Sequence, residues 1–180
     1  MSIDPAIACL ILACTELLFM VAAIYKLRDP RRFGEIVAAY RVLPLAVARR
    51  ASAVVPLLEL VVAFGLLFEG SRKFVMCVGI VLLLAYAVAI AINLYRGRRD
   101  LACGCGGPDD RRTIAGWMVW RNIGIATLLA AAALPWNDRP LALTDAVTIG
   151  FGTVACALVY LCLDRLLGRN GPLTDVLRTP

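Results

Sequence analysis

Long apolar runs, separated by short polar segments, dominate this chain of 180 residues. Most of the runs reach the roughly 20 residues that a helix needs to cross a bilayer. The pattern predicts an all-α, polytopic membrane helical bundle that forms a single integral-membrane domain over residues 1–180. About five transmembrane helices are expected, at residues 7–25, 53–68, 74–95, 114–136 and 141–163.

The segment 26–52, between the first two runs, is too polar to span a membrane. It is interrupted at Pro44, where a helix is expected to break. Within it, arginines surround four apolar side chains that recur at helical spacing: Phe33, Ile36, Val37 and Tyr40. This pattern predicts an amphipathic helix that lies on the membrane surface between the first two spans.

The composition agrees with a membrane protein. Hydrophobic residues make up 61% of the chain, against roughly 45–50% in soluble domains. The formal net charge of +6 would suit a nucleic-acid-binding protein, but no RNA- or DNA-binding motif accompanies it. Basic residues that flank apolar runs are instead expected of membrane insertion. We therefore expect membrane lipid, and not nucleic acid, around this chain.

The distribution of Lys and Arg among the loops predicts how the chain is oriented in the inner membrane of a bacterium. Residues 26–52 hold seven of them, 96–113 hold five and 164–180 hold three. The loops of the opposite side hold only Arg72, Lys73 and Arg139. Because basic loops stay in the cytoplasm, the N-terminus is expected outside. The loops 26–52 and 96–113 are expected on the cytoplasmic side.

The most distinctive chemical feature is the pair Cys103 and Cys105, with Gly104 between them, in the basic loop. Two thiols this close can form only a small, strained ring, and strained disulfides tend to be labile and catalytic. Gly104 permits the backbone angles that closure needs, and nearby arginines favour the reactive thiolate. The pair is therefore a candidate for thiol–disulfide catalysis. The alternatives are half of a metal site completed by another chain, and two cysteines that are close by chance.

The remaining cysteines lie inside apolar runs, at Cys9, Cys14, Cys77, Cys156 and Cys162. Buried cysteine commonly behaves as a small hydrophobe, so we interpret these five as packing residues. A second pair between Cys9 and Cys77, both expected near the outer leaflet, is the alternative. The absence of histidine excludes most structural zinc frameworks and His-based acid–base catalysis. No metal ligand and no cofactor are assigned, and a quinone is considered only as an electron acceptor.

Three ionisable residues fall at matching depth in three predicted helices. At about 1.5 Å of rise per residue, Glu59, Arg121 and Glu16 lie roughly 10, 12 and 13 Å from the cytoplasmic ends of their runs. Charges within a membrane normally face the bundle interior and pair with one another. We therefore expect Arg121 to pair with Glu59, Glu16 or both, with Asn122 as a neighbouring hydrogen-bonding group. Such a cluster either fixes helix register alone or forms a functional polar pocket.

The order of several short motifs resembles the MauE methylamine-utilisation proteins, within the wider group of MauE/DoxX-like redox-associated membrane proteins. The resemblance covers most of the chain. Its motifs are Lys26 with Asp29-Pro30 and Phe33, Tyr40 with Pro44, Pro56-Leu57-Leu58-Glu59, Cys103-Gly104-Cys105-Gly106-Gly107, and Arg121-Asn122. The resemblance implies a role in maturing methylamine dehydrogenase, whose periplasmic small subunit carries several disulfides. It also implies a thioredoxin-like partner, MauD.

The cysteine pair predicts an integral-membrane thiol–disulfide redox protein, and the resemblance implies that it assists disulfide formation in, or transport of, the methylamine dehydrogenase small subunit. In this hypothesis Cys103 and Cys105 cycle between dithiol and disulfide and pass electrons to MauD or to a quinone. Two alternatives stay open. One is a small-molecule transporter that uses the layer of Glu16, Glu59 and Arg121, and the other is a non-catalytic assembly scaffold for MauD.

Overall fold

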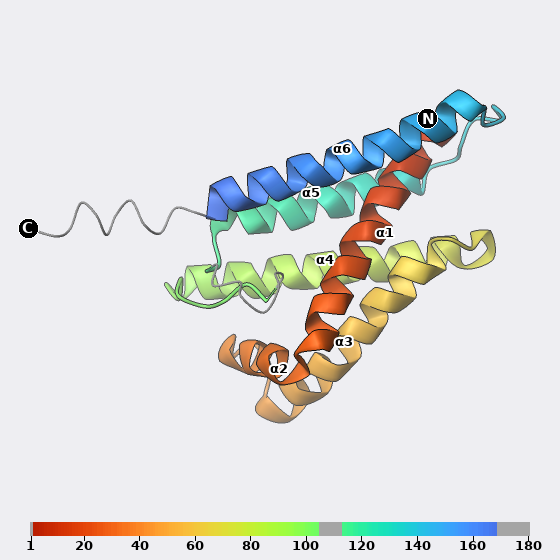
Figure 1. The fold of residues 1–180 in the computed structure, drawn as a ribbon. Helices are drawn as coiled ribbons and strands as arrows, with labels where there is room; N and C mark the ends of the chain where they lie inside the picture. Colours follow the sequence, from red (N-terminus) through yellow and green to blue (C-terminus); the bar gives the residue numbers. More distant parts are fainter. Residues whose placement is uncertain (1, 105–112, 169–180) are drawn as a thin grey trace, which may run out of the picture.

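The computed structural model describes residues 2–104 and 113–168, and within these ranges every regular element is a helix (Figure 1). The elements are α1 (Pro5–Arg28), α2 (Pro30–Ala39), α3 (Leu45–Gly65), α4 (Glu69–Tyr95), α5 (Gly116–Ala132) and α6 (Leu143–Gly168). By length and composition, α1, α4 and the part of α6 from Leu143 to Asp164 can cross a membrane. The predicted fold class, an all-α membrane bundle, is confirmed.

The helices α3 and α5 correspond to the second and fourth predicted runs, but their ends differ from those runs. α3 begins at Leu45 rather than at residue 53, because the helix continues through a polar stretch that carries Arg49 and Arg50. Hydropathy marks the apolar part of a helix, and not the helix itself. α5 ends at Ala132 and has 17 residues. That α3 and α5 span the membrane stays a prediction.

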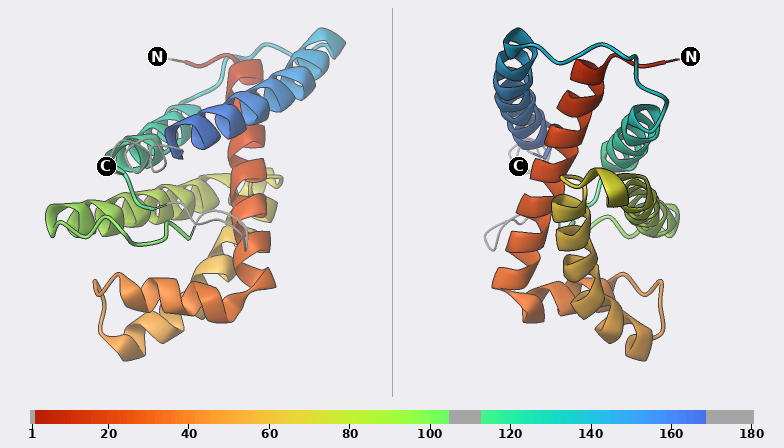
Figure 2. Two further views of the ribbon diagram at one scale, coloured as in Figure 1. Left: turned by 60° about the vertical axis from the view of Figure 1, so that its left-hand side comes forward. Right: turned by 90° about the vertical axis from the view of Figure 1, so that its right-hand side faces the viewer.

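The predicted amphipathic helix within residues 26–52 is α2, and the break at Pro44 separates it from α3. Asp29 both ends α1 and begins α2, where its Oδ1 accepts a hydrogen bond from the backbone N–H of Arg32 at 3.0 Å. Pro30 occupies the first position of α2, where its missing N–H is not needed. The chain therefore turns within one residue, and α2 lies crosswise at the end of α1 (Figure 2).

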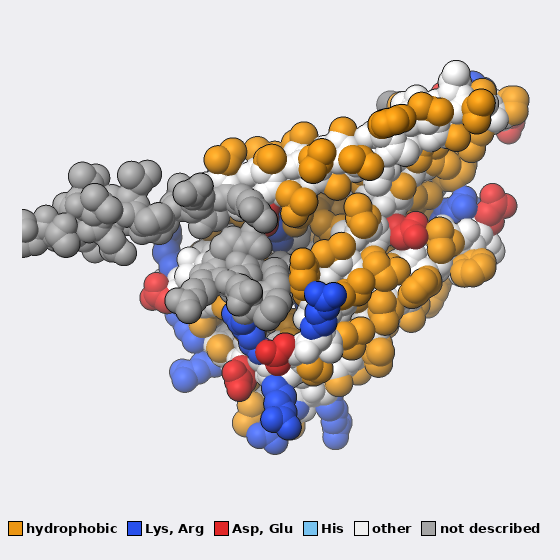
Figure 3. Space-filling model, viewed as in Figure 1, with side chains coloured by type: hydrophobic (Ala, Val, Ile, Leu, Met, Phe, Trp, Pro, Cys, Tyr) orange, Lys and Arg blue, Asp and Glu red, His pale blue; other side chains and the backbone are white. Residues whose placement is uncertain are grey.

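α1 is the central helix and packs against α2, α3, α5 and α6, while α4 packs against α5 and α3. The largest fully buried apolar side chains include Phe19, Met76, Leu83 and Leu129. The outer surface also stays apolar, as the hydrophobic side chains over α1, α3 and α6 show (Figure 3). Such a surface is expected where lipid, and not water, surrounds the bundle.

The connections gather at two ends of the bundle. At what we call the N-terminal end, the backbone N–H of Ile3 donates to the Pro135 carbonyl at 2.9 Å. The Arg72 guanidinium lies 5.1 Å from the centroid of the Trp136 ring at this end. The N-terminus, the α3–α4 turn and the α5–α6 connection therefore share one end.

At the opposite end, which we call the α2 end, α2 meets the chain that leaves α4. Arg98 Nη2 donates to the Ala39 carbonyl at 2.8 Å, and Arg96 Nη1 donates to the Arg41 carbonyl at 3.0 Å. The two basic loops thus lie together, as the predicted orientation requires. That this end faces the cytoplasm stays a prediction.

Candidate functional site

A buried ion pair joins the last turn of α1 to α3. Lys26 Nζ contacts Glu59 Oε1, and the two residues are only 5% and 0% exposed. The hydroxyl of Tyr86, on α4, donates a second hydrogen bond to the same oxygen at 2.7 Å. Single charges are costly to bury and are stabilised by a close partner of opposite sign. Three helices therefore meet at one carboxylate.

Two aromatic rings enclose the lysine. Its Nζ lies 5.4 Å from the ring centroid of Phe33 and 5.1 Å from that of Tyr86, which are cation–π distances. Phe33 reaches this position because the turn at Asp29 folds the first turn of α2 back over the end of α1. We call Lys26, Phe33, Glu59 and Tyr86 the lysine centre.

Cys103 lies at the entrance to the cysteine loop and is held against α2. The hydroxyl of Tyr40, the residue that ends α2, donates to the Cys103 carbonyl oxygen at 3.4 Å. Cys103 also packs on a small apolar cluster whose buried members are Tyr40, Ile90, Ile114 and Met118. Cys105, the second thiol of the pair, lies outside the described residues.

Gly104 connects the loop to the lysine centre. Its φ is +72°, in the left-handed region that side chains rarely adopt. A Cβ there would lie 3.1 Å from Ile36 Cγ2 and 3.8 Å from Phe33 Cδ2, so the backbone is pressed against α2. Phe33 is therefore a neighbour of both Gly104 and Lys26. The Phe33 ring thus lies between the start of the Cys-Gly-Cys sequence and the buried ammonium of Lys26.

The chain that enters the loop is fixed from two sides. Ala102 and Thr113 form an isolated antiparallel β-bridge, which holds the two ends of the loop together. Arg98 Nη1 donates to Asn93 Oδ1 at 3.0 Å and to the Tyr40 carbonyl at 3.3 Å. Because Asn93 is fully buried, its amide anchors the arginine to α4. A fixed cation therefore stands five residues before Cys103.

A cleft of about 310 Å³ opens beside Cys103, between α2 and the segment 100–102. Its polar lining carries both signs of charge, and Tyr40 connects it to the cysteine. The lining residues are Arg32, Glu35, Ile36, Ala39, Tyr40, Asp100, Leu101 and Ala102. Charged and apolar side chains thus both line this cleft at the end of α2.

A second ion pair joins α5 to α6. Arg121 Nη1 lies 3.3 Å from Asp164 Oδ1 and 3.1 Å from the Tyr160 hydroxyl oxygen. The guanidinium also lies 5.2 Å from the centroid of the Trp117 ring. The neighbouring Asn122 is 3% exposed, and its Nδ2 has no hydrogen-bond partner within the described ranges.

The structure gives the predicted intramembrane charges other partners than the sequence indicated. The expected pairing of Arg121 with Glu59 or Glu16 is not the arrangement found, because Glu59 contacts Lys26 and Arg121 contacts Asp164. Glu16 forms no ion pair with any residue that the structure describes. Arg121 and Asn122 are neighbours in the sequence of α5, but no hydrogen bond joins their side chains in the described part of the chain. In place of one layer of charges, the structure has two separate ion pairs, Lys26–Glu59 and Arg121–Asp164.

Sequence reasoning missed Lys26 and Asp164 as partners because both lie at the edges of apolar runs. Lys26 follows the first predicted run and Asp164 follows the last, so both were expected at the membrane boundary. A lysine side chain is long enough to place its ammonium several ångströms away from its own Cα. The signal was the spacing of Lys26, Asp29-Pro30 and Phe33, which makes the turn that encloses the ammonium.

The fold and the site define a helical integral-membrane protein in which a buried lysine–glutamate pair underlies a loop that begins with a cysteine. The model of the family described as "Methylamine utilisation protein MauE" matches residues 4–136, which include α1 to α5. The chain belongs to the MauE family.

Relatives of similar length support this assignment. Methylamine utilization protein MauE of Methylophilus methylotrophus is 32% identical over 92% of this chain and 88% of its own. The protein of the same name from Paracoccus denitrificans is 32% identical over 96% of this chain and 93% of its own. That from Methylorubrum extorquens is also 32% identical, over 88% and 85%. No solved structure matches the chain.

Proposed function

We propose that this protein acts in methylamine utilisation as a membrane thiol–disulfide redox protein that assists maturation of the methylamine dehydrogenase small subunit. The observation that carries the proposal is the position of Cys103. Tyr40 bonds to its carbonyl, and the next residue, Gly104, packs against α2 beside the lysine centre. The Cys-Gly-Cys sequence supports the chemistry. Membership of the MauE family, whose proteins are named for methylamine utilisation, supports the metabolic role.

The proposed partner is a thioredoxin-like protein of the MauD type that carries a disulfide. A thiolate of the pair attacks that disulfide, a mixed S–S bond forms, and one partner sulfur leaves as a thiolate. The second thiolate of the pair then attacks the mixed bond. Cys103 and Cys105 end as a disulfide and the partner as a dithiol, so two electrons and two protons have moved to the partner. The reverse sequence uses the same atoms, and the two reduction potentials set the direction.

The surroundings of Cys103 favour this chemistry in two ways. Arg98, held by Asn93 and by backbone carbonyls of α2, keeps a cation on the chain that leads to the thiols. A nearby cation favours thiolate over thiol. The cleft beside Tyr40 offers a place where a polar segment of the partner can lie next to Cys103.

The test compares serine variants of the three cysteines Cys103, Cys105 and Cys162 in cells that grow on methylamine. Cys103→Ser and Cys105→Ser should each lower active methylamine dehydrogenase at least about ten-fold, because neither can complete the exchange. Cys162→Ser is the matched control, since this cysteine is exposed on α6 and should leave activity unchanged. The membrane level of each variant is measured by immunoblot. Full dehydrogenase activity with Cys105→Ser would overturn the proposal.

A further inference from the structure

Exposed arginines gather at the α2 end, where α2 meets the start of α3 and the chain that leaves α4, and Figure 3 shows Lys and Arg side chains around this end. None of these arginines forms an ion pair with a carboxylate that the structure describes. The exposed carboxylates of this end, within the described ranges, are Glu35 and Asp100 in the lining of the cleft. The set, which we call the arginine surface, is Arg28, Arg31, Arg41, Arg49, Arg50, Arg96 and Arg99.

Helix packing brings these arginines together from distant parts of the sequence. A Cβ on Gly34, in α2, would lie 3.5 Å from the side-chain oxygen of Ser52, in α3, so the two helices touch there. Arg31 and Arg49 each stand three residues before this contact, which is about one helical turn. The chain that leaves α4 is joined to the end of α2 by the arginine–carbonyl hydrogen bonds described above. The positive charge of the three segments is therefore presented on one rigid end of the bundle.

The opposite end of the bundle also carries guanidinium groups, but carboxylates of the chain itself lie beside them. Arg139 lies between Asp4 and Asp145, and Arg72 Nη1 lies 3.9 Å from Glu69 Oε1. The charge of these two arginines is thus compensated within the protein. The arginine surface has no such compensation from the described residues, so its charge is complementary to an anion outside the protein.

Exposed apolar side chains accompany the arginines where the chain enters α3. Leu43, Leu45 and Val47 are 45%, 57% and 46% exposed, and they directly precede Arg49 and Arg50. An acidic protein segment or a nucleic acid would match the charge but would leave these apolar side chains in water. A bilayer surface matches both, because its phosphates lie directly above its acyl chains and interfacial segments bury apolar side chains at this boundary.

We propose that the arginine surface binds anionic phospholipids of the surrounding bilayer. The guanidinium groups form paired hydrogen bonds with the headgroup phosphates, while Leu43, Leu45 and Val47 lie against the acyl chains. This binding holds α2 at the level of the headgroups and fixes the depth of the chain that packs on it. The inference goes beyond the proposed function and does not depend on the chemistry of the cysteines.

The experiment titrates the full-length protein in detergent with phosphatidylglycerol that carries a fluorophore on one acyl chain. Fluorescence anisotropy gives the apparent Kd, and phosphatidylcholine with the same fluorophore is the zwitterionic control. Phosphatidylglycerol should bind at least about ten-fold more tightly at roughly 50 mM salt, and this preference should fall below about three-fold at roughly 500 mM, because salt screens exposed charges. Equal affinity for the two lipids at low salt would overturn the inference.

Charge-removing variants locate the binding on the arginine surface. Arg49→Gln with Arg50→Gln should weaken phosphatidylglycerol binding at least about ten-fold, because each basic residue beside an anionic bilayer contributes a factor of about five. Binding of phosphatidylcholine should not change. Arg28→Gln with Arg31→Gln repeats the test on a different segment where the first variant aggregates. Unchanged binding of phosphatidylglycerol in a folded variant would overturn the inference.

Two controls separate a lipid surface from a general effect of charge and from a different partner. Lys73→Gln with Arg139→Gln removes the same charge at the N-terminal end and should change the apparent Kd less than about two-fold. A ten-fold loss in this control would show that net charge alone attracts the lipid. Hexaglutamate and inorganic phosphate should displace the labelled lipid far less effectively than unlabelled phosphatidylglycerol does. Displacement by hexaglutamate at equal concentration would assign the surface to an acidic protein segment and overturn the inference.

Discussion

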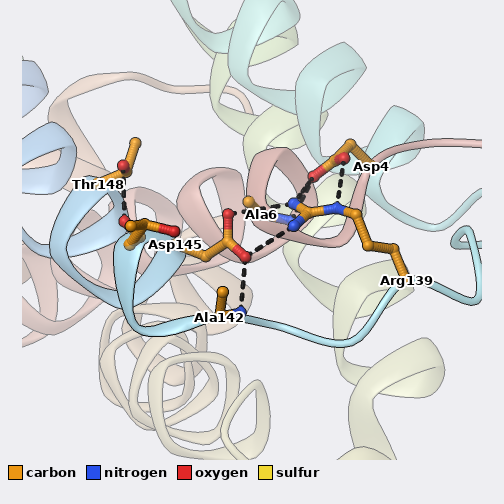
Figure 4. Close-up of polar contacts among 7 residues, drawn as sticks. Asp4, Ala6, Arg139, Ala142, Asp145 and Thr148 are labelled. Atoms are coloured by element: carbon orange, nitrogen blue, oxygen red, sulfur yellow. Dashed lines mark hydrogen bonds and ion pairs between the residues drawn. The ribbon is translucent and has the colours of Figure 1, made fainter.

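Two of the charged clusters that join helices in the described part of this protein differ in their contact with water. The lysine centre joins α1, α3 and α4 inside the bundle, where Lys26 and Glu59 are buried. At the N-terminal end, the Arg139 guanidinium lies between two carboxylates, at 2.9 Å from Asp4 and 2.8 Å from Asp145 (Figure 4). The side chain of Arg139 is 42% exposed.

The comparison shows that the number of contacts is a poor guide to what a cluster contributes. Arg139 makes four hydrogen bonds to two carboxylates, more than Lys26 makes to Glu59. Water can replace each partner of an exposed charge, so such networks contribute little to stability. No water replaces a lost partner in the bundle interior, so each member of the lysine centre is needed. Four predictions test this contrast, from the largest effect to the smallest.

Neutralising one member of the buried pair should have the largest effect. Glu59→Gln leaves the Lys26 ammonium buried without a countercharge, so the free energy of unfolding should fall by about 3–5 kcal/mol. Denaturation of the protein in detergent measures the change. The double variant Lys26→Met with Glu59→Gln removes both charges and should recover more than half of the loss. A double variant that is less stable than Glu59→Gln would break the contrast, because the charges would not then depend on each other.

Gly104→Ala should have the next largest effect. The left-handed backbone costs a side chain about 1–2 kcal/mol, and the new Cβ would press on Ile36. The loop should therefore move off α2, and Cys103 should react faster with a maleimide. Gly116→Ala is the matched control, because a Cβ there meets nothing within 4 Å. Equal labelling rates in the two variants would show that the loop does not depend on its contact with α2.

Tyr40→Phe removes the neutral hydrogen bond that joins the end of α2 to the Cys103 carbonyl. The lost bond to the Cys103 carbonyl should lower stability by about 0.5–1.5 kcal/mol, towards the lower figure because the bond is 3.4 Å long. The apolar cluster around the ring stays in place. Thermal unfolding in detergent measures the change. A loss as large as that of Glu59→Gln would contradict the ranking.

Acid titration of the exposed network should have the smallest effect. The hydrogen bond from Arg139, with a second one from the backbone of Ala6, holds the pKa of Asp4 below its usual value. A carboxylate with a lowered folded pKa adds stability above its unfolded value near 3.9, and this stability is lost as the pH falls through the folded pKa. The difference in melting temperature between wild type and Asp4→Asn should therefore be small at pH 7 and vanish in acid. A difference that grows in acid would have the wrong sign.

The sequence predicted the parts of the fold that depend on hydropathy and on local turn residues. The apolar runs located the helices, and the spacing of Phe33, Ile36 and Tyr40 located α2. The break predicted at Pro44 is found, but the start of α3 at Leu45 was not predicted, because the first residues of this helix lie outside the apolar run 53–68. The features that were predicted depend on residues that are close in the sequence, so they can be predicted without knowledge of the tertiary structure.

Partners across helices could not be predicted in the same way. The depth of a residue follows from its place in a run, but the direction in which it faces depends on how the helices cross. Matching depth therefore predicted Arg121 as the ion-pair partner of Glu59. In the structure, the packing of α1 against α3 makes Lys26 the partner.

A redox titration of the cysteine loop tests the central claim most directly. The full-length protein is equilibrated in nanodiscs across a series of dithiothreitol buffers, trapped with acid and alkylated. Cys103 and Cys105 should lose and regain their thiols together, as one two-electron couple, with a midpoint that shifts when Lys26→Met and Glu59→Gln remove the neighbouring charges. Thiols that stay open to alkylation in every buffer, the most oxidising included, would contradict the account.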